Sequence, residues 1–304
     1  MFTDITGKKR LKVGLHTHTK LSDGRLQPEE AIALYAAGGY DILALTDHWK
    51  YGSGCEYEGM AVISGCEYNM TGWRNGIQET FHIVGVAMHQ DPEIPKSLMN
   101  DETIPFYDRI RTVVSMIRNT GGLAVLAHPA WSLNTPEQIM SAGDFDALEI
   151  YNSVSECCMS DRPYSGLLVD MLAREGLRYP LLATDDTHYY NGDEMRGMIM
   201  VEADAVTELG LVGAIRANRF YATQGPEVHL ERISEDEVKV TCTPAVKVAF
   251  LSNLPWTKGR MVRGENITEA TYTIKHNMKE LFIRAEVTDE KGLVAWSNIL
   301  KIMD

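Results

Sequence analysis

The sequence predicts a mixed α/β fold in which a barrel of about seven β/α units precedes a small antiparallel β-sandwich. Short apolar runs alternate with helical segments from residue 11 to about residue 225, as they do in βαβ units. From about residue 226, apolar and polar residues alternate without helical segments, which is typical of half-buried antiparallel strands. We therefore expect two domains, the barrel over residues 1–225 and the sandwich over residues 226–304. The alternation alone does not distinguish a closed barrel from an open sheet.

The first domain is expected to begin with a strand at residues 11–19 and a helix at residues 28–39. Pro28 opens this helix and two glycines close it, at the ends that these residue types favour. The polar segment 71–79 is expected to be a loop. Further strands are expected at residues 40–48, 59–69, 80–88, 123–129, 145–152, 179–188, 197–203 and 219–225. Further helices are expected near residues 103–119, 135–141, 163–175 and 206–217.

The second domain is expected to contain only strands, joined by polar turns. Period-2 alternation places them near residues 238–242, 246–250, 272–274, 281–287 and in a last segment that ends at residue 300. We expect this domain to shield one side of the barrel. The alternative is that its loop 252–260 reaches the pocket, where Trp256, Lys258 and Arg260 would contact the substrate.

Composition and charge restrict the classes of function. The chain has 304 residues, of which 44% are apolar, and its net charge of −13 disfavours long nucleic acids because an acidic surface repels polyanions. No apolar run approaches the roughly 20 residues of a membrane span, and the first residues lack the apolar core of a signal peptide. The five cysteines include the adjacent pair Cys157–Cys158 and no CxxC motif, which fits a reducing compartment. We expect a cytoplasmic protein; a homo-oligomer stays open.

Histidines and carboxylates gather at the ends of the predicted strands. Residues i and i+2 of a strand face the same side, so His16 and His18 point together, as do Asp186 and His188. Four further residues of the same chemical type lie in or at the ends of other strands, namely His48, Glu67, His82 and His128. In an α/β barrel, chemistry gathers at the C-terminal ends of the strands. The sequence therefore predicts a metal site there.

A single histidine in a strand is more often a hydrogen-bonded residue than a metal ligand. The number of histidines at strand ends therefore decides between these two interpretations. Six of the nine histidines lie in such positions, together with three acidic residues. Burying so many ionisable groups without a cation would be costly. The other three histidines are expected to be ordinary surface residues, namely His89, His229 and His276.

These motifs together resemble the polymerase and histidinol phosphatase (PHP) superfamily of metal-dependent phosphoesterases. The matching pieces follow the family's order over residues 11–190: HTHT and SDG at 16–24, TDH at 46–48, the glutamate of GCEYN, the histidine of FHIVG, AHP at 127–129 and the D-x-H of TDDTH at 186–188. The resemblance implies a distorted (β/α)7 barrel with two or three divalent ions of zinc, manganese or iron. The family often has a small residue where this chain has Asp185, and Asp186 is aligned with the ligand because it stands two before His188.

The resemblance also implies how the ligands divide among the ions. One ion would be held by His16, His18, Glu67 and Asp186. A second would be held by Glu67, as a bridging ligand, with His82 and His128. A third would be held by Asp23, His48 and His188. The nucleophile would then be a hydroxide on the metals, and no protein nucleophile is needed.

Charge favours a small anionic substrate. Three divalent ions with three carboxylate ligands leave a net charge of about +3 at the site, and two ions leave a net charge of about +1. Either positive charge attracts small anions such as a phosphate monoester. Cations and hydroxyls in loops near the ligands are candidate substrate contacts or solvated loop residues, namely Lys20, Arg25, Lys50, Tyr189 and Arg196. Trp131 and Asn152 could line the pocket. Ligand histidines could be oriented by Thr46, Asp47 and Glu149.

Three other functions stay open at this stage. The same metal site could hydrolyse a carbamate, an amide or a carboxylic ester, because a β-rich tail like this one also occurs in a branch of the family with such activities. A nuclease for short oligonucleotides would need a basic track, which the overall charge does not indicate. A non-catalytic module is disfavoured because the ligand set is complete.

Overall fold

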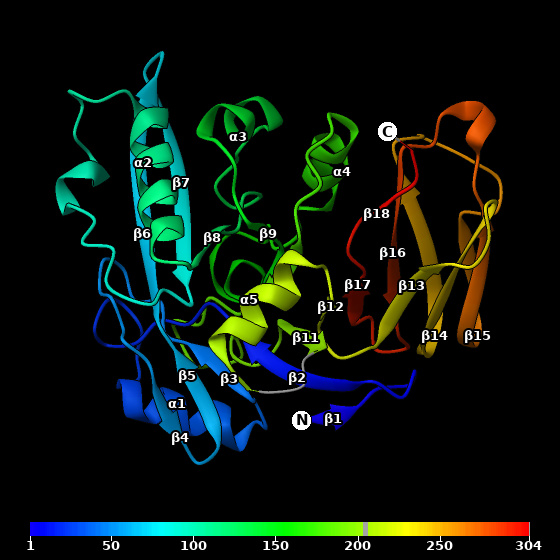
Figure 1. Cartoon of the computed structure of the whole chain (residues 1–304), viewed down its shortest axis with the longest axis horizontal. Coiled ribbons are helices and arrows are strands. Elements are labelled where there is room, and N and C mark those ends of the chain that lie inside the picture. The colour runs from blue at the N-terminus through cyan, green and yellow to red at the C-terminus, as the bar shows by residue number, and fades with distance from the viewer. Residues whose placement is uncertain (203–205, 304) are drawn as a thin grey trace.

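The computed structural model describes residues 1–202 and 206–303 of the chain. It is a mixed α/β structure with two sheets and few helices. The hairpin of β6 and β7 stands at one end of the molecule and the strands of the C-terminal region stand at the other (Figure 1). No helix among the described residues is long and apolar enough to cross a membrane.

The first sheet joins strands from both ends of the chain. Its order is β13-β14-β16-β17-β12-β11-β2-β3-β5-β4, with β1, β15 and β18 paired to β2, β14 and β16. The strands from the N-terminal two thirds of the chain are β1 (Phe2–Thr3), β2 (Lys9–Gly14), β3 (Ile42–Ala44), β4 (Cys55–Tyr57), β5 (Met60–Ile63), β11 (Met198–Glu202) and β12 (Phe220–Thr223). Within it, β2 lies between β3 on one edge and β11 on the other.

The second sheet has the order β10-β9-β8-β7-β6. Its strands are β6 (Gly65–Arg74), β7 (Ile77–Val86), β8 (Leu123–Leu126), β9 (Ala147–Asn152) and β10 (Leu181–Thr184). The prediction of a loop over residues 71–79 is wrong, because β6 and β7 continue through it and leave only Asn75 and Gly76 as a turn. Both turn residues have positive φ, 53° and 76°, which is the geometry of a two-residue hairpin turn.

Parallel and antiparallel pairs are mixed in both sheets. The pairs β2–β3, β3–β5, β8–β9 and β9–β10 are parallel, whereas β6–β7, β7–β8 and β11–β2 are antiparallel. A two-residue connection cannot cross over, so the β6–β7 pair has to be antiparallel. Isolated bridges between Thr17 and Thr187 and between His48 and Glu67 connect the two sheets. A closed barrel remains a prediction.

Five α-helices pack around these sheets. They are α1 (Pro28–Ala37), α2 (Phe106–Asn119), α3 (Pro136–Ala142), α4 (Gly166–Arg174) and α5 (Glu208–Arg216), among the residues described. Short turns of helix lie at η1 (Lys96–Met99), η2 (Ser155–Met159) and η3 (His276–Met278). As predicted, Pro28 lies in the first turn of α1; a capping box of Gln27 and Glu30 satisfies the first backbone N–H groups. Helix α2 begins later than predicted, after Pro105.

The C-terminal region consists of strands, as predicted, and its buried apolar residues belong to a cluster that also contains residues of the N-terminal part, such as Tyr35 and Leu43. The strands are β13 (Val228–Arg232), β14 (Glu237–Ser252), β15 (Met261–Thr273), β16 (Phe282–Thr288), β17 (Val294–Trp296) and β18 (Leu300–Lys301). Strand β17 pairs with β12 and thereby joins this region to the rest of the first sheet. The buried Arg284 adds an ion pair to Asp170 of α4 at 2.7 Å. The boundary at residues 225/226 stays a prediction and falls between β12 and β13.

Candidate metal centre

The structure brings all nine residues of the predicted ligand set into one cluster. Each of them has an ionisable side-chain atom within 3.7 Å of another member. His16 and His18 directly follow β2, Glu67 lies in β6, and Asp186 and His188 follow β10. The bridges that connect the two sheets occur in these same segments. The junction of the sheets therefore positions the cluster.

A fully buried group lies at the centre of the cluster. The ligand atoms of His16, His18, Glu67 and Asp186 are all within 4.8 Å of one another, and this is the set expected for the first ion. The two imidazole Nε2 atoms each lie 3.1 Å from Asp186 Oδ1. The distances to Glu67 Oε2 are 3.3 Å from His16 and 2.9 Å from His18. This group can hold a metal ion.

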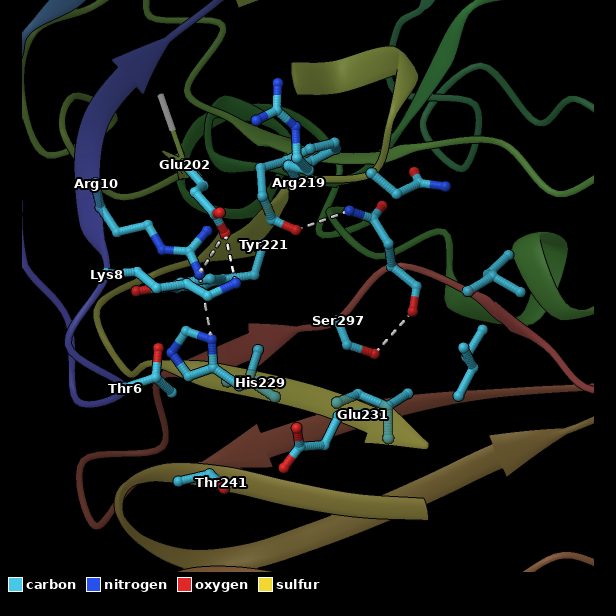
Figure 2. Close-up of a pocket in the computed structure, with 17 residues that line it drawn as sticks. Thr6, Lys8, Arg10, Glu202, Arg219, Tyr221, His229, Glu231, Thr241 and Ser297 are labelled. Carbon is cyan, nitrogen blue, oxygen red and sulfur yellow. Dashed lines mark hydrogen bonds and ion pairs between the residues drawn. The ribbon is translucent and has the colours of Figure 1, made fainter. Parts of the chain in front are cut away.

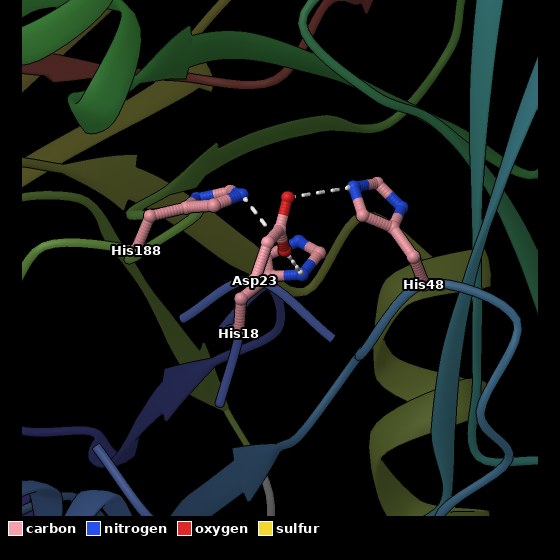
Figure 3. Close-up of side chains that lie close together, drawn as sticks. All are labelled: His18, Asp23, His48 and His188. Atoms are coloured by element: carbon pink, nitrogen blue, oxygen red, sulfur yellow. Dashed lines mark ion pairs between the residues drawn. The ribbon is translucent and has the colours of Figure 1, made fainter. Parts of the chain in front are cut away.

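A second group lies nearer the surface, around Asp23 (Figure 3). Asp23 is about half exposed and lies 3.5 Å from His18, 3.5 Å from His188 and 3.7 Å from His48. The resemblance implied Asp23, His48 and His188 for one ion. The structure adds His18, whose ring stacks on that of His188 at 4.1 Å.

Glu67 connects the remaining histidines to the centre. Its Oε1 lies 2.8 Å from His82 and 3.4 Å from His128, and its Oε2 lies 3.2 Å from His48. The third group that can hold an ion is His48, Glu67 and His82. His128 was expected beside His82 and packs edge-on to it at 4.8 Å, but it is outside this group. A carboxylate with imidazoles around both oxygens has the form of a bridging ligand.

Unsatisfied polar atoms test whether these residues fit a metal ion. His48 Nδ1, Glu67 Oε2 and Asp186 Oδ1 are buried and make no hydrogen bond. Buried charged oxygens that lack a hydrogen bond are costly, and a cation between them would remove that cost. Imidazole and carboxylate are ligands that suit zinc, manganese and iron. The donor set and its unpaired atoms therefore fit divalent ions.

The electrostatics of the cluster follow from burial and close opposite charges. Burial alone would lower the pKa of His18, but the adjacent carboxylates of Asp186 and Glu67 raise it to about 9. Burial lowers the pKa of His48 to about 4, which leaves a neutral imidazole at pH 7. Burial opposes the charge on Glu67, but His16, His82 and His48 hold its pKa well below the usual range. The carboxylates are thus ionised, as ligands must be.

Glu149 holds the inner histidines in place. It is 1% exposed; its Oε1 accepts a hydrogen bond from His16 Nδ1 at 2.7 Å, and its Oε2 accepts one from His128 N at 2.8 Å. Asn152 donates to both Glu149 and Asp186, at 3.0 and 3.1 Å. Bonds of this kind fix the orientation of ligand imidazoles.

Asp47 holds the loop that carries Asp23. It accepts hydrogen bonds from the backbone and hydroxyl groups of Thr19 and Ser22 at 2.7–3.1 Å. Thr46 Oγ1 accepts from the backbone N–H of Thr17 at 3.0 Å. Gly24 is needed for close approach, since a Cβ there would lie 2.4 Å from the carbonyl oxygen of His18.

The predicted substrate contacts differ in their surroundings. Arg25 is exposed and lies over the ring of Tyr189 at 4.9 Å, next to His188, whereas Lys20 and Lys50 are exposed without such a contact. Arg196 makes an ion pair with Glu156 at 2.8 Å, so its charge is already balanced. Trp131 packs edge-on to His128 at 4.9 Å.

Several residues of the site were not predicted from the sequence. Asp193 is buried and accepts hydrogen bonds from the backbone of His188 and Tyr189 at 2.7 and 2.8 Å. Ser22 and Ser132 each lie 3.2 Å from the Nδ1 of the histidine four residues earlier, and that spacing was a usable signal. Asp185 lies away from the ligands and accepts from Tyr35 at 2.7 Å.

The three histidines left outside the site also differ from one another. His89 is exposed and His276 is more than one third exposed, as expected of surface residues. The prediction for His229 is wrong, because its side chain is only 15% exposed and lies beside two carboxylates. Those carboxylates are Asp4, which is far away in the sequence, and Glu227, which lies just before β13. The periodicity of apolar residues gives no signal at either place.

One solved structure indicates the fold, and two others are similar over part of the chain. A two-domain protein from Bacteroides vulgatus, described as containing a PHP-like metal-dependent phosphoesterase, aligns over 99% of this chain and 98% of its own, with 16% identity and a TM-score of 0.53. A metal-dependent phosphoesterase from Bifidobacterium adolescentis covers 58% of this chain and 87% of its own, with 15% identity and a TM-score of 0.42. An amidohydrolase from Chromobacterium violaceum covers 60% and 89%, with 20% identity and a TM-score of 0.39.

Comparison with curated proteins finds no match. The PHP domain family model matches residues 14–127. This range contains six of the nine clustered residues, from His16 to His82, and the other three follow at His128, Asp186 and His188. Residues 14–127 of this chain are therefore similar to the PHP domain family.

Proposed function

We propose that this chain is a metal-dependent phosphoesterase that hydrolyses a small phosphate monoester. The observation that carries the proposal is the cluster of six histidines and three carboxylates with unpaired buried oxygens on Glu67 and Asp186. Two or three divalent ions of zinc, manganese or iron, when bound, would supply Lewis acidity and positive charge for hydrolysis. The family supports hydrolase chemistry, and the choice of a phosphate ester rests on charge.

The chain's own residues would bind, orient and shield the substrate. Arg25, supported on the Tyr189 ring, offers an exposed guanidinium beside His188 and Asp23. Lys20 lies in the same loop and adds a second exposed cation. Guanidinium groups bind phosphate oxygens in a forked geometry, so Arg25 is the stronger candidate. Trp131, which covers His82 and His128, would exclude water from that side.

The finer description of the fold belongs to the same proposal. We take residues 1–225 as a distorted (β/α)7 barrel and residues 226–304 as a β-sandwich accessory domain. Support comes from the bridges between the sheets around His16–His18 and from the succession of strands β13–β18 after α5. The cluster would then lie at the C-terminal ends of barrel strands, where α/β barrels place their chemistry.

A screen for phosphate release tests this function. Purified protein loaded with zinc, manganese or iron would be assayed on a panel of small phosphate monoesters, aryl esters, carbamates and short oligonucleotides. The expected result is turnover of one or more monoesters, which Asp186→Asn lowers at least about a hundredfold, more than a change outside the ligand set would. His276→Ala is the matched control, a histidine away from the cluster, and should retain wild-type rates.

The outcomes separate the proposal from its alternatives. Preference for aryl esters or carbamates would replace phosphate ester hydrolysis by acyl hydrolysis on the same site. Preference for oligonucleotides would indicate a nuclease. Equal activity in Asp186→Asn and in the wild-type protein would show that the cluster is not where the chemistry occurs.

A further inference from the structure

A cavity of about 350 Å³ opens beside the N-terminal segment, and the two cations at that end of it are already paired (Figure 2). Arg10 pairs with Asp4 at 2.6 Å, and Lys8 pairs with Glu202 at 2.8 Å. The charges at this end of the cavity are therefore balanced, and they do not select a charged ligand.

Two adjacent cysteines form a reactive group outside the metal centre. Cys157 and Cys158 lie in η2, the single turn of π-helix that follows β9, and both are exposed. Their sulfur atoms are 2.9 Å apart, whereas a disulfide bond is about 2.0 Å long. Cys55 is the only other exposed cysteine, and the remaining two are buried. Cys157 and Cys158 are therefore the pair that oxidation would join.

The oxidation of this pair needs only a hydroperoxide. The Cys158 sulfur attacks one peroxide oxygen, the O–O bond breaks, and a sulfenic acid forms while hydroxide leaves and takes up the thiol proton to become water. The Cys157 sulfur then attacks the sulfenic sulfur, the S–OH bond breaks, and the hydroxyl group leaves as water with the Cys157 proton. Burial and the neighbouring Cys158 raise the pKa of Cys157 to about 12, so Cys157 is a thiol at pH 7 and reacts second. Two thiols and one hydrogen peroxide thus give one disulfide and two molecules of water.

The resulting disulfide would be strained and therefore easily reduced. The Cα atoms of adjacent residues are about 3.8 Å apart across a trans peptide, whereas those of a disulfide are usually about 4.4–6.8 Å apart. The backbone of η2 has to change to close the ring. Strained and exposed disulfides are the labile ones, and they commonly have regulatory roles. A dithiol reductant would therefore restore the two thiols.

Hydrogen bonds connect the turn that carries the pair to the metal centre. Ser155, the first residue of η2, donates from its N–H and from its hydroxyl to Asn152 Oδ1, at 3.1 and 2.7 Å. The side-chain amide of Asn152 donates in turn to Glu149 and Asp186, at 3.0 and 3.1 Å. A change in the backbone of η2 would thus reach two carboxylates of the centre.

A second connection runs through Glu156, which directly precedes Cys157. Its carboxylate accepts hydrogen bonds from the Tyr151 hydroxyl at 2.6 Å and from Arg196 at 2.8 Å. The Tyr151 ring stacks on Trp296 of β17 at 5.3 Å, which fixes this end of the connection. A movement of η2 would therefore draw Glu156 away from Tyr151 and leave the charge of Arg196 unbalanced.

We propose that Cys157 and Cys158 are a reversible oxidation site that responds to hydroperoxides and weakens metal binding at the ligand cluster. In the reduced form, Ser155 holds Asn152 in place. In the oxidised form, the closed ring distorts η2 and removes a hydrogen bond between Ser155 and Asn152. The oxidation itself does not depend on the reaction proposed for the metal centre.

Mass spectrometry of the full-length protein tests the oxidation site. Metal-free wild type, Cys157→Ser, Cys158→Ser and the control Cys55→Ser would be treated with hydrogen peroxide, alkylated and digested. Wild type and Cys55→Ser should lose two hydrogen atoms from the peptide that contains both adjacent cysteines, and dithiothreitol should restore them. The two variants of the pair should not show this loss. An unchanged peptide in wild type, or the same loss in Cys158→Ser, would overturn the proposal.

Manganese binding tests the connection to the centre. Protein would be oxidised, freed of peroxide and then titrated with manganese, which prefers oxygen and nitrogen ligands and does not compete for thiols. Oxidised wild type should bind manganese about 3- to 10-fold more weakly than reduced wild type, as expected for the loss of one neutral hydrogen bond. Peroxide treatment should leave the affinity of Cys158→Ser unchanged.

Two results would overturn the connection. One is an unchanged manganese affinity in protein whose cysteines are joined and which remains folded by circular dichroism. The other is a peroxide-treated Cys158→Ser that loses affinity as wild type does. Absence of manganese binding by the reduced protein would overturn both the metal centre and this connection, while the mass change decides the oxidation site by itself.

Discussion

Replacing Glu149 by Gln tests whether the inner histidines have to be held in place for metal binding. The carboxylate has both oxygens occupied: Oε1 accepts from His16 Nδ1, and Oε2 accepts from His128 N and Asn152 Nδ2. Gln has the same shape but only one accepting oxygen. At least one buried donor would then face an NH2 group and lose its hydrogen bond.

The size of the effect follows from that lost bond. A hydrogen bond to a charged group contributes about 1.5–3 kcal/mol. Because about 1.4 kcal/mol corresponds to a factor of ten in an equilibrium constant, Glu149→Gln should weaken metal binding about 10- to 100-fold. This agrees with the usual cost of removing a group that orients a ligand histidine.

Metal affinity can be measured by competition with a chromophoric chelator, with circular dichroism to show that the variant is folded. Glu175→Gln is the matched control, since Glu175 is exposed at the end of α4. An affinity of folded Glu149→Gln within twofold of wild type would refute the argument that this carboxylate positions His16 and His128.

Three further predictions concern the centre and the C-terminal region. Chelation should abolish turnover and lower the melting temperature, because Glu67 and Asp186 would keep unpaired buried oxygens; full turnover after chelation, measured with metal-free buffers, would contradict this. Gly24→Ala should lower turnover at least about tenfold in a folded protein, since its Cβ would lie 2.4 Å from the His18 carbonyl oxygen and displace the Asp23 loop; unchanged kinetics would show that the loop adapts. Removing residues 226–304 should cause aggregation, because it exposes the edge of β12 and removes Arg284, the ion-pair partner of Asp170. Size-exclusion chromatography would detect the aggregates, and a stable monomer would show that residues 1–225 fold alone.

The candidate centre could be predicted from the sequence because its signal is local. His16 and His18, like Asp186 and His188, are two residues apart, and strand geometry alone places each pair on one side. The division of the nine clustered residues into separate groups of ligands could not be predicted in the same way. Whether His18 approaches Asp23 depends on the conformation of the loop that Asp47 holds. The hydrogen bonds between Asp47 and this loop join residues that are far apart in the chain.

The errors in the fold have a similar origin. The Asn75-Gly76 pair is a strong hairpin signal, but the polar residues around it predict a loop, because a hairpin end in solvent lacks an apolar pattern. His229 looked like a surface residue because it lies in a strand with polar neighbours. Its burial comes from the N-terminal segment around Asp4, and no period in the sequence reports such a contact.

The position of β2 between β3 and β11 has a consequence for how the chain folds during synthesis. One edge of β2 is covered only by β11, so it stays unpaired until residues 198–202 have left the ribosome. At about 5–20 residues per second, that interval lasts about 10–40 s. An open strand edge of this kind can pair with other chains, and the nascent protein would need a chaperone to protect it.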